Sequence, residues 1–295
     1  MGEIKIGDLV ARKSYNRDIL FKVVEIINQS GRERVYILKG VNMRIMVDAP
    51  ETDLTVQTAK ELRKFEKSNH EMVSRHIDSG TNLRKARSGI RGIKGTFFEK
   101  SRNPFGRPGR VLHLDGDKDY LDMCMKAYKE MEVNATGKYM PESQQPKGVT
   151  DMLKEYLPDI LVLTGHDSVE KNKDINDISH YRNSRFYVAA VKEARKFEPS
   201  YDDLVIYAGA CQSYFEAILD AGANFASSPN RVLIHALDPV FVCHMVAYSN
   251  IERIIPVEEL VSKTITGIEG IGGLQTRGKY REGLPGPVNT RGQRR

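Results

Sequence analysis

The pattern of hydrophobic and polar positions divides the chain into parts of different construction. Between residues 3 and 50, apolar and polar residues alternate in short runs, for example over 7–12, 20–26 and 35–40, and turn-forming residues separate the runs. Alternation with a period of two is typical of half-buried antiparallel strands. Because several short strands at this spacing favour a small barrel, residues 1–50 are predicted to form an SH3-like β-barrel.

After residue 50, the spacing of apolar residues changes from the strand period to the helical period. Residues 51–78 place their apolar side chains near one face of a helix, so we expect a helix there. Residues 79–109 are rich in glycine, proline and cations, and the stretch 84–107 has eight Lys or Arg for a single acid. Such a composition is typical of a solvated linker. Residues 51–109 are thus predicted to be a helix followed by a basic Gly/Arg linker.

From residue 110 to 262, short apolar runs alternate with segments of helical period. The runs lie near 111–114, 133–140, 159–166 and 204–211, and the helical segments near 119–131, 147–157, 180–197 and 213–222. Strand–helix alternation with right-handed crossovers builds a doubly wound, mainly parallel sheet. The sequence therefore predicts an α/β domain over 110–262 and a basic Gly/Arg tail over 263–295.

Charge is distributed unevenly over these parts, although the whole chain of 295 residues has a formal net charge of only +6. Residues 1–109 carry +9, residues 110–262 carry −8 and residues 263–295 carry +5. An acidic body between basic flanks favours basic partners, so basic proteins are the substrates that we expect.

Several classes of protein are excluded by composition. No apolar stretch approaches the roughly 20 residues that span a bilayer, and the N-terminus lacks the apolar core of a signal peptide. We therefore expect no membrane insertion and a cytoplasmic location. The three cysteines have neither paired nor metal-type spacing, so a disulfide framework, a metal site and a cofactor are not expected.

Cys211 is the predicted nucleophile. It ends the apolar run 204–211 and precedes a predicted helix, and small residues before it leave the thiol uncrowded. A thiolate at a helix N-terminus is stabilised by free amides and by the helix dipole, which lowers the thiol pKa. Cys124 and Cys243 lie in apolar segments and are expected in the core.

His166 is the predicted acid and base. It ends the apolar run before that of Cys211, so it lies at the end of the neighbouring strand. Carboxyl ends of adjacent parallel strands meet at the same edge of a sheet, where ligands bind, and the pair therefore fits thiol catalysis. His180 and His235 are weaker candidates, and His113 is expected in the core.

Chain order narrows the class of enzyme. His166 precedes Cys211 by 45 residues, whereas the histidine of class I glutamine amidotransferases follows the cysteine. The order, the spacing and the ending Ala210-Cys211 resemble the caspase, clostripain, gingipain, legumain and separase group of peptidases, although here a glycine precedes the histidine instead of following it. The resemblance implies a caspase-like fold and an oxyanion hole formed by the backbone N–H groups of Asp167 and Cys211.

The whole chain also resembles one family in particular. Three blocks, Gly7-Asp-Leu-Val-Ala-Arg12, Leu163-Thr-Gly-His-Asp167 and Tyr207-Ala-Gly-Ala-Cys-Gln-Ser213, carry a resemblance to the YabG family of sporulation-specific cysteine proteases. The resemblance implies an endopeptidase that processes spore-coat proteins after arginine and other basic residues, and that also processes itself. It further implies a location in the mother-cell cytoplasm of a sporulating bacterium, in association with the spore coat.

A site for an arginine side chain needs a buried or half-buried carboxylate. Asp115 and Asp117 follow the first predicted strand of the α/β domain, and thus lie at the same sheet edge as the catalytic pair. Asp167 and Asp238 are alternatives. We favour Asp115 as the residue that binds the substrate cation.

The basic linker has two functional interpretations. Arg84, Arg87 and Arg91 are candidate self-cleavage sites, because proteases cut exposed, unstructured segments. The same cations would also contact the phosphates of a nucleic acid or another polyanion, but the absence of an aromatic stacking platform disfavours specific nucleic-acid recognition. One alternative to a peptidase is a non-catalytic polyanion-binding or coat-scaffold protein. Another is an amidase, which the order of His166 before Cys211 disfavours.

Overall fold

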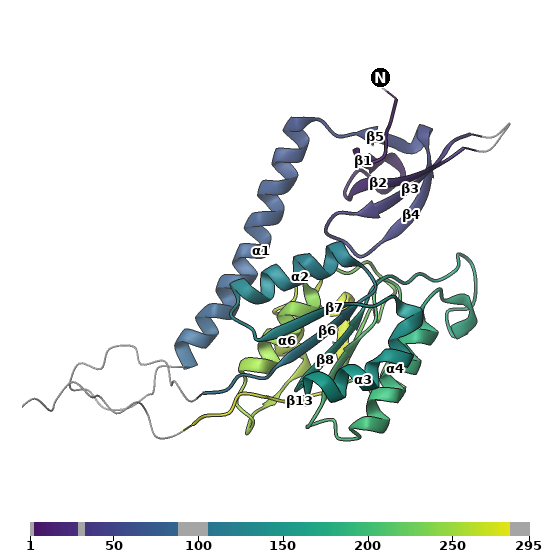
Figure 1. Ribbon diagram of the computed structural model, residues 1–295. Coiled ribbons are helices and arrows are strands. Elements are labelled where there is room, and N and C mark those ends of the chain that lie inside the picture. Colours follow the sequence, from purple (N-terminus) through teal and green to yellow (C-terminus); the bar gives the residue numbers. More distant parts are fainter. Residues whose placement is uncertain (1–2, 29–32, 88–105, 284–295) are drawn as a thin grey trace, which may run out of the picture.

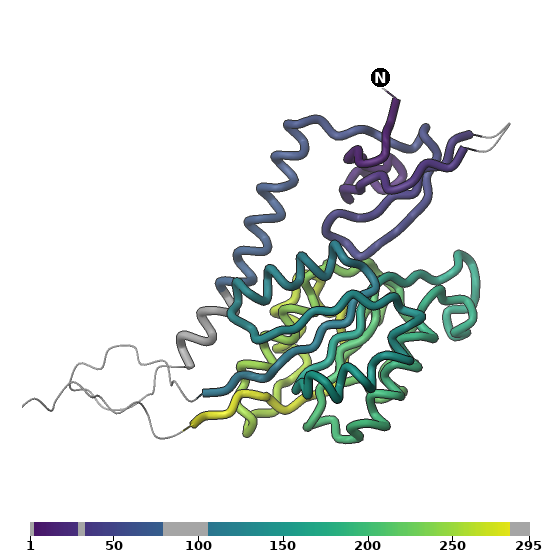
Figure 2. The backbone as a smooth tube through the Cα atoms, viewed as in Figure 1, coloured from purple at the N-terminus to yellow at the C-terminus, as the bar shows by residue number. Residues whose placement is uncertain are grey.

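The computed structural model describes residues 3–28, 33–87 and 106–283, and for residues 79–87 it describes the backbone alone. Within these ranges the chain forms a small antiparallel sheet, a long helix and a layered α/β domain (Figure 1). The backbone trace shows the small sheet lying against one end of the α/β domain (Figure 2). The long helix starts near the small sheet and runs from there toward the α/β domain.

Five short strands form the N-terminal sheet, in the order β4-β3-β2-β1-β5, and all of their pairings are antiparallel. They are β1 (Leu9–Arg12), β2 (Leu20–Ile27), β3 (Val35–Gly40), β4 (Met46–Pro50) and β5 (Leu54–Val56). Alternate side chains such as Val10, Phe21, Val23 and Leu38 are buried in a common core, which is what a period of two produces. Because β4 and β5 stand at opposite ends of the strand order, closure into an SH3-like barrel stays a prediction.

The long helix begins and ends later than the sequence pattern predicts. Strand β5 occupies the first part of the predicted helix, and α1 runs over Ala59–Arg87, into the predicted linker. Its start is fixed by a capping box, in which Thr58 Oγ1 accepts from the Glu61 amide at 3.3 Å and the Glu61 carboxylate accepts from the Thr58 amide at 2.7 Å. Helix α1 packs along α6 (Asp238–Tyr248). No helix in the described part of the chain is apolar over a length sufficient to cross a membrane.

A six-stranded sheet forms the centre of the α/β domain, in the order β12-β10-β9-β8-β6-β7. Its strands are β6 (Val111–Asp115), β7 (Ala135–Tyr139), β8 (Ile160–Thr164), β9 (Val205–Ala208), β10 (Phe225–Ser227) and β12 (Ile271–Gly273). Neighbours pair in parallel, except that β12 is antiparallel to β10. The predicted α/β class and the mainly parallel sheet are confirmed, whereas a caspase-like fold stays a prediction.

Part of the predicted tail belongs to this domain. Strand β12 and strand β13 (Thr276–Arg277), which pairs with β11 (Ile254–Ile255), both lie beyond residue 263. Strands of two or three residues are too short for a hydrophobic period to reveal. The expectation of a tail is therefore wrong for residues 263–283, and residues 284–295 lie outside the described part.

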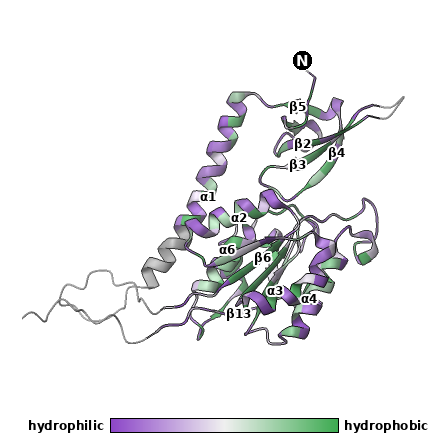
Figure 3. Ribbon diagram, in the orientation of Figure 1, coloured by the Kyte–Doolittle hydropathy of each residue, from purple (hydrophilic) through white to green (hydrophobic). Residues whose placement is uncertain are grey.

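Helices cover both faces of the sheet. Helices α2 (Lys118–Glu130) and α6 pack on one face, and α3 (Gln145–Tyr156), α4 (Ser184–Phe197) and α5 (Phe215–Asp220) pack on the other. The remaining short elements are α7 (Val257–Val261) and the 3-10 turns η1 (Lys13–Tyr15), η2 (Glu51–Asp53), η3 (Glu142–Gln144), η4 (Ile178–His180) and η5 (Gly267–Glu269). Successive residues of a strand alternate between the two cores, so the central strands are apolar on both sides (Figure 3).

The chain reverses its direction across the sheet between β6 and β8. From β6 it passes to β7 at one edge, and it then returns over β6 to β8 on the other side. In open α/β sheets, ligands bind at such a switch point, at the carboxyl ends of the strands. The register pairs Asp115 at the end of β6 with Thr164 at the end of β8, so the residues that follow these two strands border the expected site.

Truncation of Leu163 tests how far stability depends on this two-sided burial. Leu163→Ala removes a fully buried side chain from β8, and such truncations cost about 2–5 kcal/mol because they leave a cavity. Urea denaturation followed by circular dichroism should show the lower free energy of unfolding. Leu274→Ala is the matched control, because Leu274 is 45% exposed. Equal losses in the two variants would contradict the assigned layers.

Candidate active site

The structure brings His166 and Cys211 to corresponding positions at one edge of the sheet. In the parallel pairing of β8 with β9, Leu163 lies opposite Ala208. His166 lies three residues beyond Leu163, and Cys211 lies three residues beyond Ala208. The two residues therefore follow adjacent strands at the same level.

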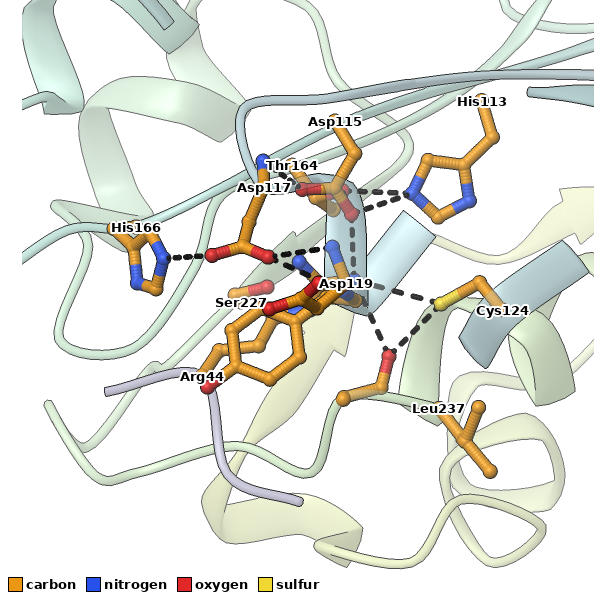
Figure 4. A network of polar contacts seen from close by, with 12 residues as sticks. Arg44, His113, Asp115, Asp117, Asp119, Cys124, Thr164, His166, Ser227 and Leu237 are labelled. Carbon is orange, nitrogen blue, oxygen red and sulfur yellow. Dashed lines mark hydrogen bonds and ion pairs between the residues drawn. The ribbon is translucent and has the colours of Figure 1, made fainter. Parts of the chain in front are cut away.

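A carboxylate holds the His166 ring. Its Nε2 lies 2.7 Å from Oδ2 of Asp117 (Figure 4), and because a carboxylate only accepts, Nε2 carries the proton of this hydrogen bond. Asp117 is the N-cap of α2 and accepts from the amides of Asp119 and Tyr120. Burial alone would raise the pKa of Asp117, but hydrogen bonds from His166 and Lys39 lower it to about 2. Asp117 therefore stays ionised and orients the imidazole.

The other ring nitrogen of His166, Nδ1, is available to take up or give a proton. Nδ1 is buried and has no hydrogen-bond partner among the described residues. The His166 amide donates to Glu142 at 2.6 Å, and its carbonyl accepts from Asn183 at 2.8 Å. A Cβ at Gly165 would overlap the Glu142 carboxylate, which explains why a glycine precedes the histidine. An imidazole with one nitrogen on a carboxylate and the other unpaired is suited to act as acid and base.

Cys211 lies in a buried turn rather than at a helix N-terminus. Helix α5 begins only at Phe215, so the expectation that a helix terminus lowers the thiol pKa is wrong. The Cys211 sulfur accepts from the Ile234 amide at 3.1 Å. Burial raises the pKa of Cys211 to about 12, and the amide of Ile234 opposes this rise. In this state the thiol is protonated and covered.

Asp167 ties together the loops that carry His166 and Cys211. Its buried carboxylate accepts from Ser213 Oγ at 2.8 Å and from Ser184 Oγ at 2.5 Å. Burial raises the pKa of Asp167, and these hydrogen bonds oppose the rise. The Asp167 side chain is thus fully engaged by these hydrogen bonds. The backbone N–H groups of Asp167 and Cys211 donate to no acceptor within the described part of the chain. They stay the candidates for the oxyanion hole.

Asp115, the favoured arginine-binding residue, already holds a guanidinium from the N-terminal sheet. Arg44 Nη2 lies 2.8 Å from Asp115 Oδ2, and both side chains are fully buried. Thr164 Oγ1 donates to the same carboxylate at 2.9 Å, and His113 Nε2 lies 3.3 Å from it. Burial would raise the pKa of Asp115, but the Arg44 charge and the hydrogen bond of His113 hold it well below its ordinary value. This position is built to receive a guanidinium.

The other candidates have structural roles. Asp117, the second predicted arginine-binding residue, is engaged by His166 and by Lys39, each at 2.7 Å, so it is not open to a substrate cation. Asp238 is fully buried and accepts from the His235 amide. Burial lowers the pKa of His235 to about 4, which leaves that ring neutral. The residues expected in the core, His113, Cys124 and Cys243, are fully buried.

Three residues at this site carry no signal in the sequence. Glu142 fixes the main chain of His166, the ring of Tyr120 lies 5.5 Å from that of His166, and Arg44 comes from a different part of the chain. The position of Asp117 was recognisable, because an aspartate directly before a helix is a common N-cap.

The predicted self-cleavage sites lie at the margin of the described part. Arg84 and Arg87 belong to the last turns of α1, where only the backbone is described, and Arg91 lies outside the described residues. A helical backbone at Arg84 and Arg87 differs from the unstructured linker that the composition predicts.

Comparisons with known proteins identify the family. A family model described as YabG peptidase U57 matches residues 5–285. The chain is also 41% identical over 290 residues to the sporulation-specific protease YabG of Bacillus subtilis (strain 168), and this alignment covers 96% of the chain and 98% of that protein. No solved structure matches the chain significantly. The chain therefore belongs to the YabG peptidase family, as its sequence blocks predict, and is a peptidase rather than a non-catalytic binding protein.

Proposed function

We propose that this peptidase is a cysteine endopeptidase, in which Cys211 is the nucleophile, His166 is the acid and base, and Asp117 orients His166. The observation that carries the proposal is the match of positions on β8 and β9. An imidazole bound to a carboxylate follows one strand, and a cysteine follows the next strand at the same level. A nucleophile, a base and a group that orients the base are the parts that this catalysis requires.

The reaction runs in two halves. His166 Nδ1 takes the thiol proton as the Cys211 sulfur attacks the scissile carbonyl, and the N–H groups of Asp167 and Cys211 hold the oxyanion. His166 then gives the proton to the leaving amine as the C–N bond breaks, and a thioester remains. A water that gives a proton to His166 then attacks the thioester carbonyl; the C–S bond breaks, the acid is released, and His166 returns the proton to the Cys211 sulfur. Asp117 stays ionised throughout and stabilises the imidazolium.

The substrates that we propose are basic proteins cut after arginine. Asp115 is a buried carboxylate at the same sheet edge and binds a guanidinium at 2.8 Å, which is the chemistry that an arginine site requires. Residues 110–262 carry a net charge of −8, which attracts basic proteins. We also propose spore-coat proteins as the substrates and the mother-cell cytoplasm as the location; the resemblance to the YabG family implies both, and the name of the relative, a sporulation-specific protease, supports a role in sporulation.

Substitution of either reacting group should abolish proteolysis without unfolding the protein. Cys211→Ala removes the nucleophile and His166→Ala removes the acid and base, and each should lower kcat for an arginyl peptide amide at least about 10³-fold. The matched control is Cys243→Ala, at a buried cysteine of α6 that should leave the rate unchanged. Full proteolysis by folded Cys211→Ala would contradict the assignment.

Asp117→Asn keeps the shape of the side chain and removes its charge. Loss of the group that orients His166 should lower kcat by about 10²–10⁴-fold. The pKa of Asp117 in the folded protein, about 2, lies below its ordinary 3.8, so the charge stabilises the fold above the ordinary pKa, and this contribution is lost as the pH falls through the lower value.

Chemical denaturation measures the second effect. The free energy of unfolding of the wild type should exceed that of Asp117→Asn at neutral pH, and the difference should shrink as the pH approaches 2. Asp119→Asn is the control, because the Asp119 side chain is 75% exposed. A difference that does not change with pH would contradict the assigned role of the charge.

Self-processing predicts defined fragments. The purified wild type should be cut after Arg84, Arg87 or Arg91, and Cys211→Ala should stay intact. Mass spectrometry of the new termini identifies the sites. A variant with glutamine at all three arginines should stay uncut and still hydrolyse an arginyl peptide. Equal fragmentation of the wild type and of Cys211→Ala would count against self-processing.

A further inference from the structure

A segment of the N-terminal sheet pairs with the backbone beside the candidate active site. Residues 42–44, in the connection between β3 and β4, form an antiparallel bridge with residues 234–236. The Arg44 amide donates to the Ile234 carbonyl at 3.1 Å, and the other end of the segment accepts from the α/β domain at 2.8 Å. In Figure 1 this connection is the part of the N-terminal sheet that reaches the α/β domain. Addition of an extended strand is a general mode of peptide recognition.

The same backbone covers the candidate nucleophile. The Ile234 amide donates to the Cys211 sulfur at 3.1 Å, and the carbonyl of Ile234 accepts from Arg44. Cys211 is only 1% exposed. The amides of Ile234 and Arg44 both oppose the dominant effect of burial, which raises the pKa of the thiol. The main chain of Arg44 therefore lies at the sulfur that a substrate must reach.

The side chain of Arg44 enters the site that Asp115 provides. Its guanidinium pairs with Asp115 at 2.8 Å, donates to the Ala236 carbonyl at 3.3 Å and lies 5.1 Å from the centre of the Tyr120 ring. A carboxylate, a carbonyl and an aromatic face are typical partners of a bound arginine. Nε and Nη1 of Arg44 have no hydrogen-bond partner among the described residues. The guanidinium therefore makes fewer hydrogen bonds than a permanently buried ion pair requires.

Four further contacts with the start of α2 hold the connection and the end of β3 in place. The Tyr120 hydroxyl lies 2.6 Å from the carbonyl oxygens of Gly40, at the end of β3, and of Met43, in the connection, and its single proton is shared between them. Lys39, at the end of β3, contacts Asp117 and Asp119, each at 2.7 Å. The segment is thus anchored to the residues that surround His166.

We propose that residues 42–44 occupy the substrate site of this peptidase as an intramolecular inhibitor, with Arg44 in the position of the arginine that precedes the scissile bond. The main chain at the thiol, the side chain on Asp115 and the antiparallel pairing with 234–236 are the contacts of a bound substrate. The protein is latent with this segment in place and becomes active when the segment withdraws. This inference rests on the proposed function, because occupation blocks proteolysis only if Cys211 is the nucleophile.

Two variants remove the anchor of the segment. Arg44→Ala deletes the guanidinium, and Arg44→Gln keeps a long polar side chain that can still pack and donate to Asp115. In both, alkylation of Cys211 by iodoacetamide and hydrolysis of an arginyl peptide amide should be at least about tenfold faster than in the wild type, because the occupied state is depopulated. The matched control is Arg34→Ala, at an arginine of the same sheet that pairs with Glu3 at the surface and should change neither rate.

The two rates separate failure of the inhibitor from failure of the catalytic function. Faster alkylation of Cys211 without peptide hydrolysis would support the occupied site and overturn the assignment of Cys211 as nucleophile. Equal alkylation and equal hydrolysis in the wild type and in a folded Arg44 variant would overturn the inhibitor and leave the catalytic function intact. Thermal unfolding followed by circular dichroism shows which variants are folded.

A crosslink tests the same proposal with Arg44 retained. Met43 and His235 are partners in the antiparallel bridge, and the Cα atoms of such partners lie about 4.5–5.5 Å apart, within the range of a disulfide. Oxidised Met43→Cys/His235→Cys should hydrolyse the arginyl peptide at least about tenfold more slowly than its reduced form. The wild type taken through the same oxidation and reduction is the control. Equal hydrolysis by the crosslinked and reduced forms would overturn the proposal.

Discussion

The buried ion pair between Arg44 and Asp115 joins the two parts of this protein at the edge of the central sheet. Both side chains are fully buried, and their charged atoms lie 2.8 Å apart. Transfer of two charges out of water is costly, and a buried charge that loses its partner costs about 3–5 kcal/mol. The carboxylate at the end of β6 therefore requires a cation, and the N-terminal sheet supplies it. This requirement favours the arrangement in which that sheet lies over the carboxyl ends of the parallel strands.

The turn after β6 serves two purposes through two neighbouring carboxylates. The Asp115 carboxylate binds the guanidinium and also accepts from the Asp117 amide at 2.9 Å, which fixes the turn. Asp117 caps α2 and holds the His166 ring. The proposed arginine site and the orientation of the proposed base thus depend on one hydrogen-bonded turn. A displacement of Arg44 acts on the same turn that positions the imidazole.

Local signals in the sequence were sufficient for strands β8 and β9 and for the placement of His166 and Cys211 beside each other, because each of these two strands is a continuous apolar run that a candidate reactive residue follows. The start of α1 was predicted too early, at residue 51, although the capping box of Thr58 and Glu61 marks its true start. The environment of Cys211 was not predictable, because it depends on Ile234 and on residues 42–44, which are distant in sequence. Short edge strands and long-range ion pairs produce no hydrophobic period in the sequence from which they could be predicted.

Burial hides the thiol of Cys211, the proposed nucleophile, and lowers its reactivity, and residues 42–44 pair with the segment that contacts the sulfur. At a pKa of about 12, Cys211 is protonated near neutral pH, and burial is the largest cause of that value. Withdrawal of residues 42–44 would uncover the backbone that contacts the sulfur and open the site to a substrate. It would also leave Asp115 as a buried carboxylate without a cation, which is an unfavourable state. The arginine of a substrate would remove this unfavourable state when it binds, and its affinity would be higher for that reason. In the proposed mechanism, latency and arginine preference therefore have the same physical origin.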